Sequence, residues 1–201
     1  SGTSNVKNPI TLAANIMNHS EHVFLSGKGA ENFAKNRNLE IVNNEYFHTK
    51  FRYNQLLNKK GEDKYGTVGC VAIDVNGNIV AGTSTGGMTN KKWGRIGDSP
   101  IIGAGTYANN STCGISSTGS GEYFIRTVAA YQVSSLLENH NYDLKKAMYK
   151  VIHEKIGAIG GDGGMIGIDK NSNISMEFNT PGMYRAYVNK YGEKEILLYS
   201  E

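Results

Sequence analysis

The chain has 201 residues, of which 39% are hydrophobic and 19% charged, with a formal net charge of +3 at pH 7. This length suits one domain with a sizeable core, and no apolar run approaches the roughly 20 residues that a membrane-spanning helix needs, so a soluble globular protein is expected. The Lys and Arg residues are scattered along the sequence without a dense basic cluster, which argues against nucleic acid as a partner.

The first part of the chain predicts mainly helices. Asn8 and Pro9 are typical of a helix start, and apolar residues repeat at helical spacing from Ile10 to Met17. Three further elements are expected: a short buried strand at 22–27, "HVFLSG", and helices at 30–35 and 48–58. The stretch 58–64, "NKKGEDK", is charged and poor in apolar residues, which indicates an exposed flexible segment.

Beyond Gly66 the pattern changes to short strands. The strands predicted at 67–74 and 79–84 flank Asn76-Gly77, the strongest short signal for a β-hairpin, so they are expected to pair. The remaining elements are expected in this order: strands at 101–105 and 112–117, helices at 121–138 and 144–156, and strands at 164–169, 175–179, 183–188 and 195–199. Because strands and helices are clustered and do not alternate, antiparallel sheets covered by helices are favoured, in a layered α+β sandwich.

The cysteines and histidines predict neither a disulfide nor a metal site. Cys70 and Cys113 each fall within a small apolar strand, where a free Cys usually behaves as a compact hydrophobic residue. His19 and His22 are close together, but no Cys, His or Glu stands near them at metal-ligand spacing. They are interpreted as surface histidines, and no metal ligand is predicted.

Polar residues that a solvated surface does not explain stand after Gly66, where strands end. They are Thr67, "TSTGG" at 83–87, "GRIGDSP" at 94–100 and "STGSGE" at 117–122. Hydroxyls, one Arg, one Asp and many glycines suit a pocket for a small zwitterion. A phosphate cradle at the start of a helix is the alternative, but "STGSGE" lacks the Lys of a P-loop and the spacing of a dinucleotide fingerprint. The loop "GAIGGDGG" at 157–164 fails on the same grounds and is interpreted as a tight loop.

Residues 66–110, "GTVGCVAIDVNGNIVAGTSTGGMTNKKWGRIGDSPIIGAGTYANN", resemble the start of the β subunit in the plant-type asparaginase and isoaspartyl peptidase family. The similarity continues through "STGSGEYFIR" at 117–126 and "FNTPGMYRA" at 178–186. Members are N-terminal-nucleophile (Ntn) hydrolases, made as one chain that cuts itself before a Thr. The resemblance implies an α+β fold, an αββα four-layer sandwich of stacked, mostly antiparallel sheets flanked by helices. It divides the chain into residues 1–66, part of an α subunit, and 67–201, a β subunit, which together form one domain.

The resemblance implies that the bond between Gly66 and Thr67 is the autocleavage site and that Thr67 is the nucleophile. A Thr hydroxyl is a poor nucleophile at neutral pH, but cleavage gives the same residue an α-amine with an unperturbed pKa of about 7.7 to 8.0, which can act as its base. Gly66 has no Cβ, so the attacking hydroxyl can approach its carbonyl closely. By the same resemblance, Thr85 lies beside Thr67 and hydrogen-bonds its hydroxyl or amine.

The family also suggests how substrate is held. Arg95 is expected to clamp the α-carboxylate, because its planar guanidinium matches a carboxylate with two hydrogen bonds, and Asp98 is expected to pair with the α-ammonium. The Thr118 hydroxyl and the Gly119 N–H are the expected oxyanion donors, and Gly121 adds a backbone contact. Together these groups would require a substrate with a free α-amino acid head.

Each assignment has a structural alternative. Thr85 could be an ordinary strand-end residue, Arg95 and Asp98 a surface ion pair, and Thr118 the N-cap of the following helix. Their joint order and spacing favour the functional roles. The resemblance then implies an enzyme that hydrolyses the side-chain amide of L-asparagine and β-aspartyl (isoaspartyl) dipeptides through an acyl-enzyme. A glycosylasparaginase, which removes a sugar from asparagine, and an unprocessed remnant with a structural or binding role stay open as alternatives. Taspase-like relatives, which cut proteins, match less well because they lack an equivalent of Asp98.

The family resemblance extends to partners. Precursors in this family carry a long stretch before the "VKNPI" helix, including the first core strand and a loop that commonly binds sodium, so most of the α subunit and that loop are expected to lie outside this chain. No other cofactor is expected. The expected partners are L-asparagine and β-aspartyl dipeptides, the α and β fragments of one precursor, and a second copy in a dimer of heterodimers, without nucleic acid or membrane. A cytoplasmic location is expected.

Overall fold

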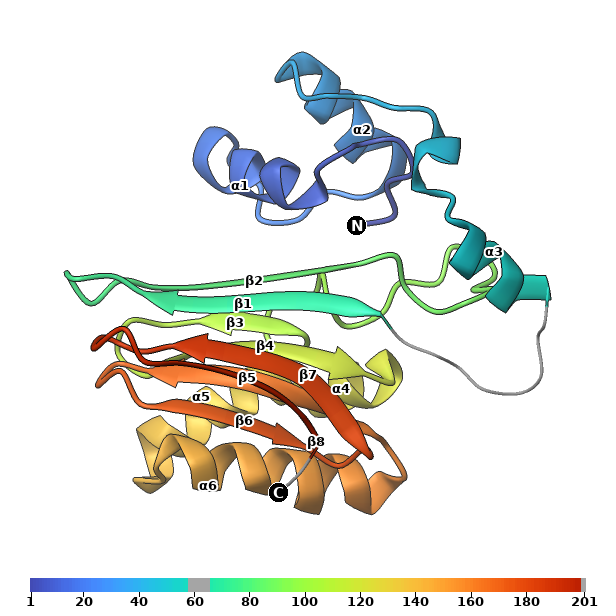
Figure 1. Cartoon of the computed structure of the whole chain (residues 1–201). Coiled ribbons are helices and arrows are strands. Elements are labelled where there is room, and N and C mark those ends of the chain that lie inside the picture. Colours follow the sequence, from blue (N-terminus) through green and yellow to red (C-terminus); the bar gives the residue numbers. More distant parts are fainter. Residues whose placement is uncertain (58–65, 200–201) are drawn as a thin grey trace. The chain divides into compact units, whose positions relative to one another are not determined.

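The computed structural model describes residues 1–57 and 66–199, which fall into two compact units (Figure 1). Among these residues, unit 1 comprises 1–57 and 87–96, and unit 2 comprises 66–86 and 97–199. Each unit has its own hydrophobic core. No helix in the described part of the chain is long and apolar enough to cross a bilayer.

Unit 1 is helical. Its elements are α1 (Pro9–His19), α2 (Gly27–Asn36), the 3₁₀-helix η1 (Asn44–Phe47) and α3 (Lys50–Leu57). Pro9 occupies the start of α1, where its missing N–H costs no intrahelical hydrogen bond. The buried core consists of Val6, Leu12, Ile16, Ala30 and Ala34. The helices predicted at 9–17, 30–35 and 48–58 are therefore confirmed as α1, α2 and α3, although residue 58 lies outside the described residues.

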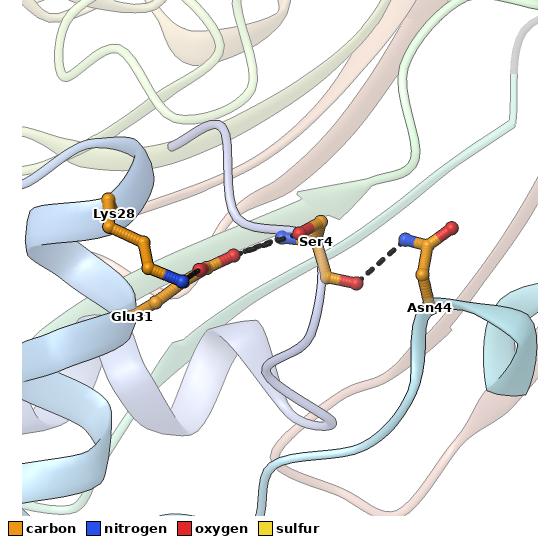
Figure 2. A network of polar contacts seen from close by, with 4 residues as sticks. All are labelled: Ser4, Lys28, Glu31 and Asn44. Atoms are coloured by element: carbon orange, nitrogen blue, oxygen red, sulfur yellow. Dashed lines mark hydrogen bonds and ion pairs between the residues drawn. The ribbon is translucent and has the colours of Figure 1, made fainter.

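A polar network ties the chain before α1 to α2 (Figure 2). Glu31 is 5% exposed and accepts hydrogen bonds of 2.9 Å from both the backbone N–H and the hydroxyl of Ser4. Lys28 forms an ion pair with the same carboxylate at 3.3 Å, and Asn44 donates to the Ser4 carbonyl at 2.8 Å. The Ser4 backbone N–H is the main reason why the pKa of Glu31 lies below its ordinary value, because it stabilises the charged form.

The buried strand predicted at 22–27 is wrong. This segment is an irregular connection between α1 and α2, in which Val23 and Phe24 are 81% and 44% exposed. Its end bonds to the start of the chain, since Gly27 N–H donates to the Ser1 carbonyl at 2.8 Å. The Ser1 amine also donates to the Leu25 carbonyl at 2.8 Å. An apolar run becomes a strand only where another strand pairs with it, and none of the described strands pairs with this one. The flexible segment predicted at 58–64 lies outside the described residues.

Unit 2 stacks two β layers on a layer of helices (Figure 1). The strands are β1 (Thr67–Ile73), β2 (Ile79–Thr85), β3 (Thr106–Ala108), β4 (Cys113–Gly119), β5 (Gly163–Asp169), β6 (Ile174–Phe178), β7 (Gly182–Val188) and β8 (Lys194–Tyr199). The central sheet has the order β3-β4-β5-β6, and β1-β2 and β7-β8 form separate two-stranded sheets. All these pairs are antiparallel, so the prediction of antiparallel sheets covered by helices is confirmed.

The main core lies between the central sheet and its helices. These are α4 (Gly121–Thr127), α5 (Ala129–His140), α6 (Leu144–Tyr149), the π-helix η2 (Lys150–Ile156) and the 3₁₀-helix η3 (Gly157–Ile159). Ile115 of β4, Phe124 of α4 and Met148 of α6 are fully buried in this core. Side chains alternate along a strand, so Cys113 and Ile115 face the helices while Ser116 faces the β1-β2 layer, where it meets Thr83.

The single long helix predicted at 121–138 is broken at Val128. This residue has φ of +49°, a left-handed conformation that is unfavourable for a β-branched residue, and it ends α4 and precedes α5. The first N–H groups of α5 find partners outside the helix: Ala130 donates to the Ala104 carbonyl at 3.1 Å and Tyr131 to the Gly103 carbonyl at 2.8 Å. The carbonyls of the turn at 103–104 therefore accept the N–H groups that the carbonyls of a preceding helical turn would otherwise accept.

The same turn explains why a second prediction from the sequence is wrong. The strand predicted at 101–105 does not form, because the carbonyls of Gly103 and Ala104 serve α5, and β3 begins only at Thr106. The second predicted helix, 144–156, is present but changes from α6 to the π-helical η2 after Tyr149. Cys113 is buried as expected, whereas Cys70 on β1 is exposed.

Candidate functional site

Thr67 and Thr85 face each other across the β1-β2 hairpin. The register runs from Ile73 opposite Ile79, beside the turn, to Thr67 opposite Thr85, where the strand pair ends. The turn sets this register, because the Asp74 carboxylate accepts the N–H groups at both 76 and 78 at 2.8 Å and holds the loop in one geometry. Side chains directly opposite on an antiparallel pair share one face of the sheet, so the predicted nucleophile and its predicted partner are brought together.

The Thr85 hydroxyl donates a hydrogen bond of 3.0 Å to the Gly66 carbonyl. Sequence reasoning predicted a bond from Thr85 to Thr67, and the structure adds this bond to the residue before it. A donor on a carbonyl oxygen stabilises the negative charge that develops there when a nucleophile adds to the carbon. The carbonyl of the predicted cleavage site thus has a hydroxyl donor already in place.

Hydroxyl groups and glycines allow the β1-β2 layer to pack closely against β4. The hydroxyls of Thr83 and Ser116 lie 2.6 Å apart and bridge the two layers. A Cβ added to Gly69 of β1 would collide with Ser116, so the two backbones approach closely there. Gly114 stands two residues before Ser116 on β4, and Val71 stands two residues after Gly69 on β1. A Cβ added to Gly114 would lie 3.8 Å from the Cβ of Val71. The two strands therefore run in opposite directions.

This alignment brings the end of β4 to the start of β1. One further step of two residues from the contact between Ser116 and Gly69 leads to Thr118 on β4 and Thr67 on β1. Figure 1 shows both strand ends on the same side of the stacked layers. Thr118 and Ser116 share a face of β4, since alternate residues point the same way. The predicted oxyanion donors Thr118 and Gly119 thus lie at the same end of unit 2 as the predicted nucleophile.

The turn after β4 is tightly packed. Gly119 and its partner Gly163 on β5 have φ of +146° and +147°, and a Cβ on either would overlap the backbone of the other strand. Only Gly adopts this backbone conformation without strain. Ser120 then bonds twice to Asp162, through its N–H to the carbonyl at 3.1 Å and through its hydroxyl to the carboxylate at 2.6 Å. The predicted substrate contact Gly121 follows at the buried start of α4.

Asp98 is anchored next to β4. It is 4% exposed, and its carbonyl accepts the N–H groups of Ile101 at 2.8 Å and Gly105 at 3.2 Å. The Gly105 carbonyl in turn accepts the Ser117 N–H at 2.8 Å, one residue before Thr118. The alternative interpretation of Asp98 as a member of a surface ion pair does not fit this burial. A carboxylate is retained at such a position where charged or hydrogen-bonding groups compensate it.

Arg95 belongs to unit 1 and is half-buried, with its backbone N–H donating to the Lys92 carbonyl at 2.9 Å. Unit 2 therefore contains Gly66, Thr67, Thr85, Asp98, Thr118, Gly119 and Gly121 and brings the first three together, while the carboxylate clamp of Arg95 stays a prediction. In residues 1–57 and 66–199, no group of three or more His, Cys, Asp or Glu side chains could hold a metal ion.

Sequence reasoning assigned no role to Asp162, which Ser120 of the turn after β4 contacts with two hydrogen bonds. The signal available was the glycine-rich run at 157–164, which was interpreted only as a tight loop.

Burial raises the pKa of Cys113 to about 12, so its thiol is protonated at neutral pH and contributes no nucleophile to the site.

Comparison with known proteins places the chain in a family. A family profile described as asparaginase matches residues 1–64 and 57–198. The isoaspartyl peptidase of Escherichia coli K12 is 47% identical over 201 residues, covering 92% of this chain and 63% of that protein. The putative isoaspartyl peptidase/L-asparaginase of Dictyostelium discoideum is 44% identical over 229 residues, with coverages of 93% and 66%. The plant-type L-asparaginase of Pyrobaculum calidifontis is 34% identical over 194 residues, with coverages of 90% and 64%.

The chain spans slightly less than two thirds of the length of these three relatives. The profile match includes every residue of the predicted site, from Gly66 to Gly121. The resemblance inferred from the sequence is confirmed: the chain belongs to the asparaginase family, together with proteins named isoaspartyl peptidase and plant-type L-asparaginase.

Proposed function

We propose that this protein is an autoprocessing Thr hydrolase that cleaves the side-chain amide of L-asparagine and the β-aspartyl bond of isoaspartyl dipeptides. The observation that carries the proposal is the meeting of Thr67, Thr85 and the Gly66 carbonyl at one end of unit 2. The names of the relatives, isoaspartyl peptidase and L-asparaginase, support the same chemistry.

Autocleavage begins with attack of the Thr67 hydroxyl oxygen on the Gly66 carbonyl carbon. Thr85 stabilises the oxyanion that forms, and the hydroxyl proton moves to the Thr67 nitrogen as the peptide C–N bond breaks. The acyl group is then an ester on the Thr67 oxygen. Water hydrolyses this ester and leaves a carboxylate on Gly66 and a free α-amine on Thr67.

In the mature enzyme the α-amine of Thr67 takes the proton from its own hydroxyl, which attacks the side-chain carbonyl carbon of the substrate. Thr118 and Gly119 donate hydrogen bonds to the resulting oxyanion. The proton passes to the leaving nitrogen, so ammonia departs from asparagine or an amino acid departs from the dipeptide. Water then cleaves the acyl-enzyme ester and releases aspartate. This chemistry needs no cofactor, since Thr67 supplies both nucleophile and base.

The substrate is recognised through its free aspartyl head. Arg95 binds the α-carboxylate, Asp98 binds the α-ammonium, and the backbone at Gly121 completes the contact. Both asparagine and isoaspartyl dipeptides present this head and differ only in the leaving group. A glycosylasparaginase would use the same head with a sugar on the leaving nitrogen.

The proposal extends to fold and assembly. We propose that the β-β-α layers of unit 2 belong to an αββα four-layer sandwich. The exposure of Val68 and Val80 on the outer face of β1-β2, 76% and 58%, favours this proposal, because a further layer would cover them. Cleavage divides the protein into fragments ending at Gly66 and starting at Thr67, and two such heterodimers pair.

The test combines mass spectrometry with substrate assays on the purified protein. A fragment starting at Thr67, ammonia from L-asparagine and leucine from β-Asp-Leu are expected, without release of glucosamine from a glycosylated asparagine. Thr67→Ala should leave one inactive, unbroken chain, while the control Thr67→Ser, which keeps a hydroxyl, should still be cut. Normal cleavage in Thr67→Ala would contradict the nucleophile assignment, and selective sugar release would favour a glycosylasparaginase.

A further inference from the structure

The glycine-rich loop that precedes β5 lies against the turn that follows β4. Gly163 packs on Gly119 without room for a side chain on either, and Asp162 bonds to Ser120 through its carbonyl and its carboxylate. Ser120 directly follows the two predicted oxyanion donors, Thr118 and Gly119. The position of this loop therefore determines where the end of β4 lies.

Asn179 holds this loop with three hydrogen bonds. Its Oδ1 accepts the Gly163 N–H at 2.8 Å, its Nδ2 donates to the Gly161 carbonyl at 3.0 Å, and its backbone N–H donates to the Gly163 carbonyl at 3.0 Å. The Asn179 side chain thus bonds to the backbone of the residues immediately before and after Asp162. An amide carries a neutral donor and a neutral acceptor on two separate atoms, so Asn suits a position facing one N–H and one carbonyl.

We propose that Asn179 is a positioning residue for catalysis, which sets the Thr118 and Gly119 oxyanion donors through the chain Asn179, Asp162 and Ser120. It touches neither substrate nor reacting atoms. The inference rests on the proposed function and deepens it, because it names what holds the oxyanion site in place.

The loop needs such a support because its own sequence does not provide one. Glycines surround Asp162 in "GGDGG", and Gly160 and Gly163 both adopt positive φ, so the free segment has a large conformational entropy. Oxyanion donors act only at about 2.7 to 3.1 Å from the developing charge, and a shift of about 1 Å can reduce the rate on the order of 10²-fold. Two side-chain hydrogen bonds from Asn179 limit that shift.

The first experiment separates catalysis from binding. In Asn179→Ala, kcat for L-asparagine, normalised to the amount of fragment starting at Thr67, should fall about 10- to 100-fold, while KM stays within about twofold. Asn179→Asp keeps an acceptor for Gly163 but places an oxygen against the Gly161 carbonyl, so an equal or larger loss of kcat is expected. The matched control is Asn173→Ala, which removes a side-chain amide bonded to Asp169 at the opposite end of β5-β6 and should leave kcat and KM unchanged.

The second experiment tests the route by a double-mutant cycle. If Asn179 acts through Asp162 and Ser120, the double variant Asn179→Ala/Ser120→Ala should lose little more kcat than the single variant with the larger loss. The control double variant Asn173→Ala/Ser120→Ala should show the sum of its two single free-energy effects on kcat. Amide hydrogen exchange at Ser120 should also be faster in Asn179→Ala than in the wild type.

The outcomes separate the two proposals. An active wild type with unchanged kcat in both Asn179 variants, a rise in KM alone, or additive losses in the cycle would overturn the positioning role and leave the proposed function intact. A wild-type protein that is processed but hydrolyses no aspartyl amide would overturn both.

Discussion

Thr85 stands opposite Thr67 in the β1-β2 register, and its hydroxyl donates to the Gly66 carbonyl at 3.0 Å. One side chain therefore faces the residues on both sides of the predicted cleavage site. In the proposed autocleavage, this hydroxyl supports the carbonyl that is attacked. After cleavage, the same position places it beside the new terminus of Thr67.

This relationship predicts that Thr85→Val slows autocleavage by about 10²- to 10³-fold, because Val has the shape of Thr but cannot donate a hydrogen bond to the oxyanion. The appearance of the fragment starting at Thr67 can be followed by mass spectrometry. Thr106→Val on β3 is the matched control and should be processed at the wild-type rate. Equal rates for all three proteins would show that the hydrogen bond to Gly66 has no part in the reaction.

Arg95→Lys should raise the KM for L-asparagine about tenfold with a smaller effect on kcat. Lys keeps the charge but cannot make two parallel hydrogen bonds to the α-carboxylate. Steady-state kinetics with the processed protein measures the change. Arg37→Lys, at the end of α2, is the control and should behave as wild type. An unchanged KM in Arg95→Lys would refute the carboxylate clamp.

The Glu31 network predicts an acid-dependent loss of stability. Since the pKa of Glu31 in the folded protein is lowered from 4.5, its stabilising effect is complete above that pH and is lost as the pH falls through the folded-state pKa. Glu31→Gln should therefore lower the melting temperature at pH 7, and the difference from wild type should shrink below about pH 4.5. Thermal melts monitored by circular dichroism can check this.

Glu40→Gln provides the comparison for that measurement. Glu40 forms an ion pair with Lys7 at 2.6 Å but is 58% exposed, and such surface pairs contribute about 0 to 1 kcal/mol. Its effect on the melting temperature should be small. If Glu31→Gln is as mild as Glu40→Gln at pH 7, the buried network does not stabilise unit 1.

The two cysteines should differ in reactivity. Cys70 is exposed, whereas Cys113 is fully buried and burial raises its pKa to about 12, so its thiol stays protonated at pH 8. Iodoacetamide should leave Cys113 unlabelled in the native protein and label it after denaturation, as read by peptide mapping. Native labelling of Cys113 would show that the core of unit 2 opens under these conditions.

Local patterns in the sequence predicted the elements whose partners are near in the chain. Asn76-Gly77 predicted that β1 and β2 pair, because the turn signal is local, whereas the family resemblance predicted that Thr85 lies beside Thr67. The start of α1 at Pro9 is equally local. The family resemblance, in turn, depended on the motifs around Gly66, Arg95 and Thr118.

Other features depended on partners far along the chain, and only the tertiary structure decided them. Val128 interrupts a continuous helical pattern because the first N–H groups of α5 bond to the turn at Ala104, and the apolar stretch at 22–27 stays irregular because none of the described strands pairs with it. In the turn after β4, Ser120 bonds to Asp162, 42 residues along the chain, and Gly163 beside it bonds to Asn179, 16 residues along the chain. Sequence periodicity reports which face of an element is apolar, whereas hydrogen bonds of this kind form only when packing brings distant backbones together.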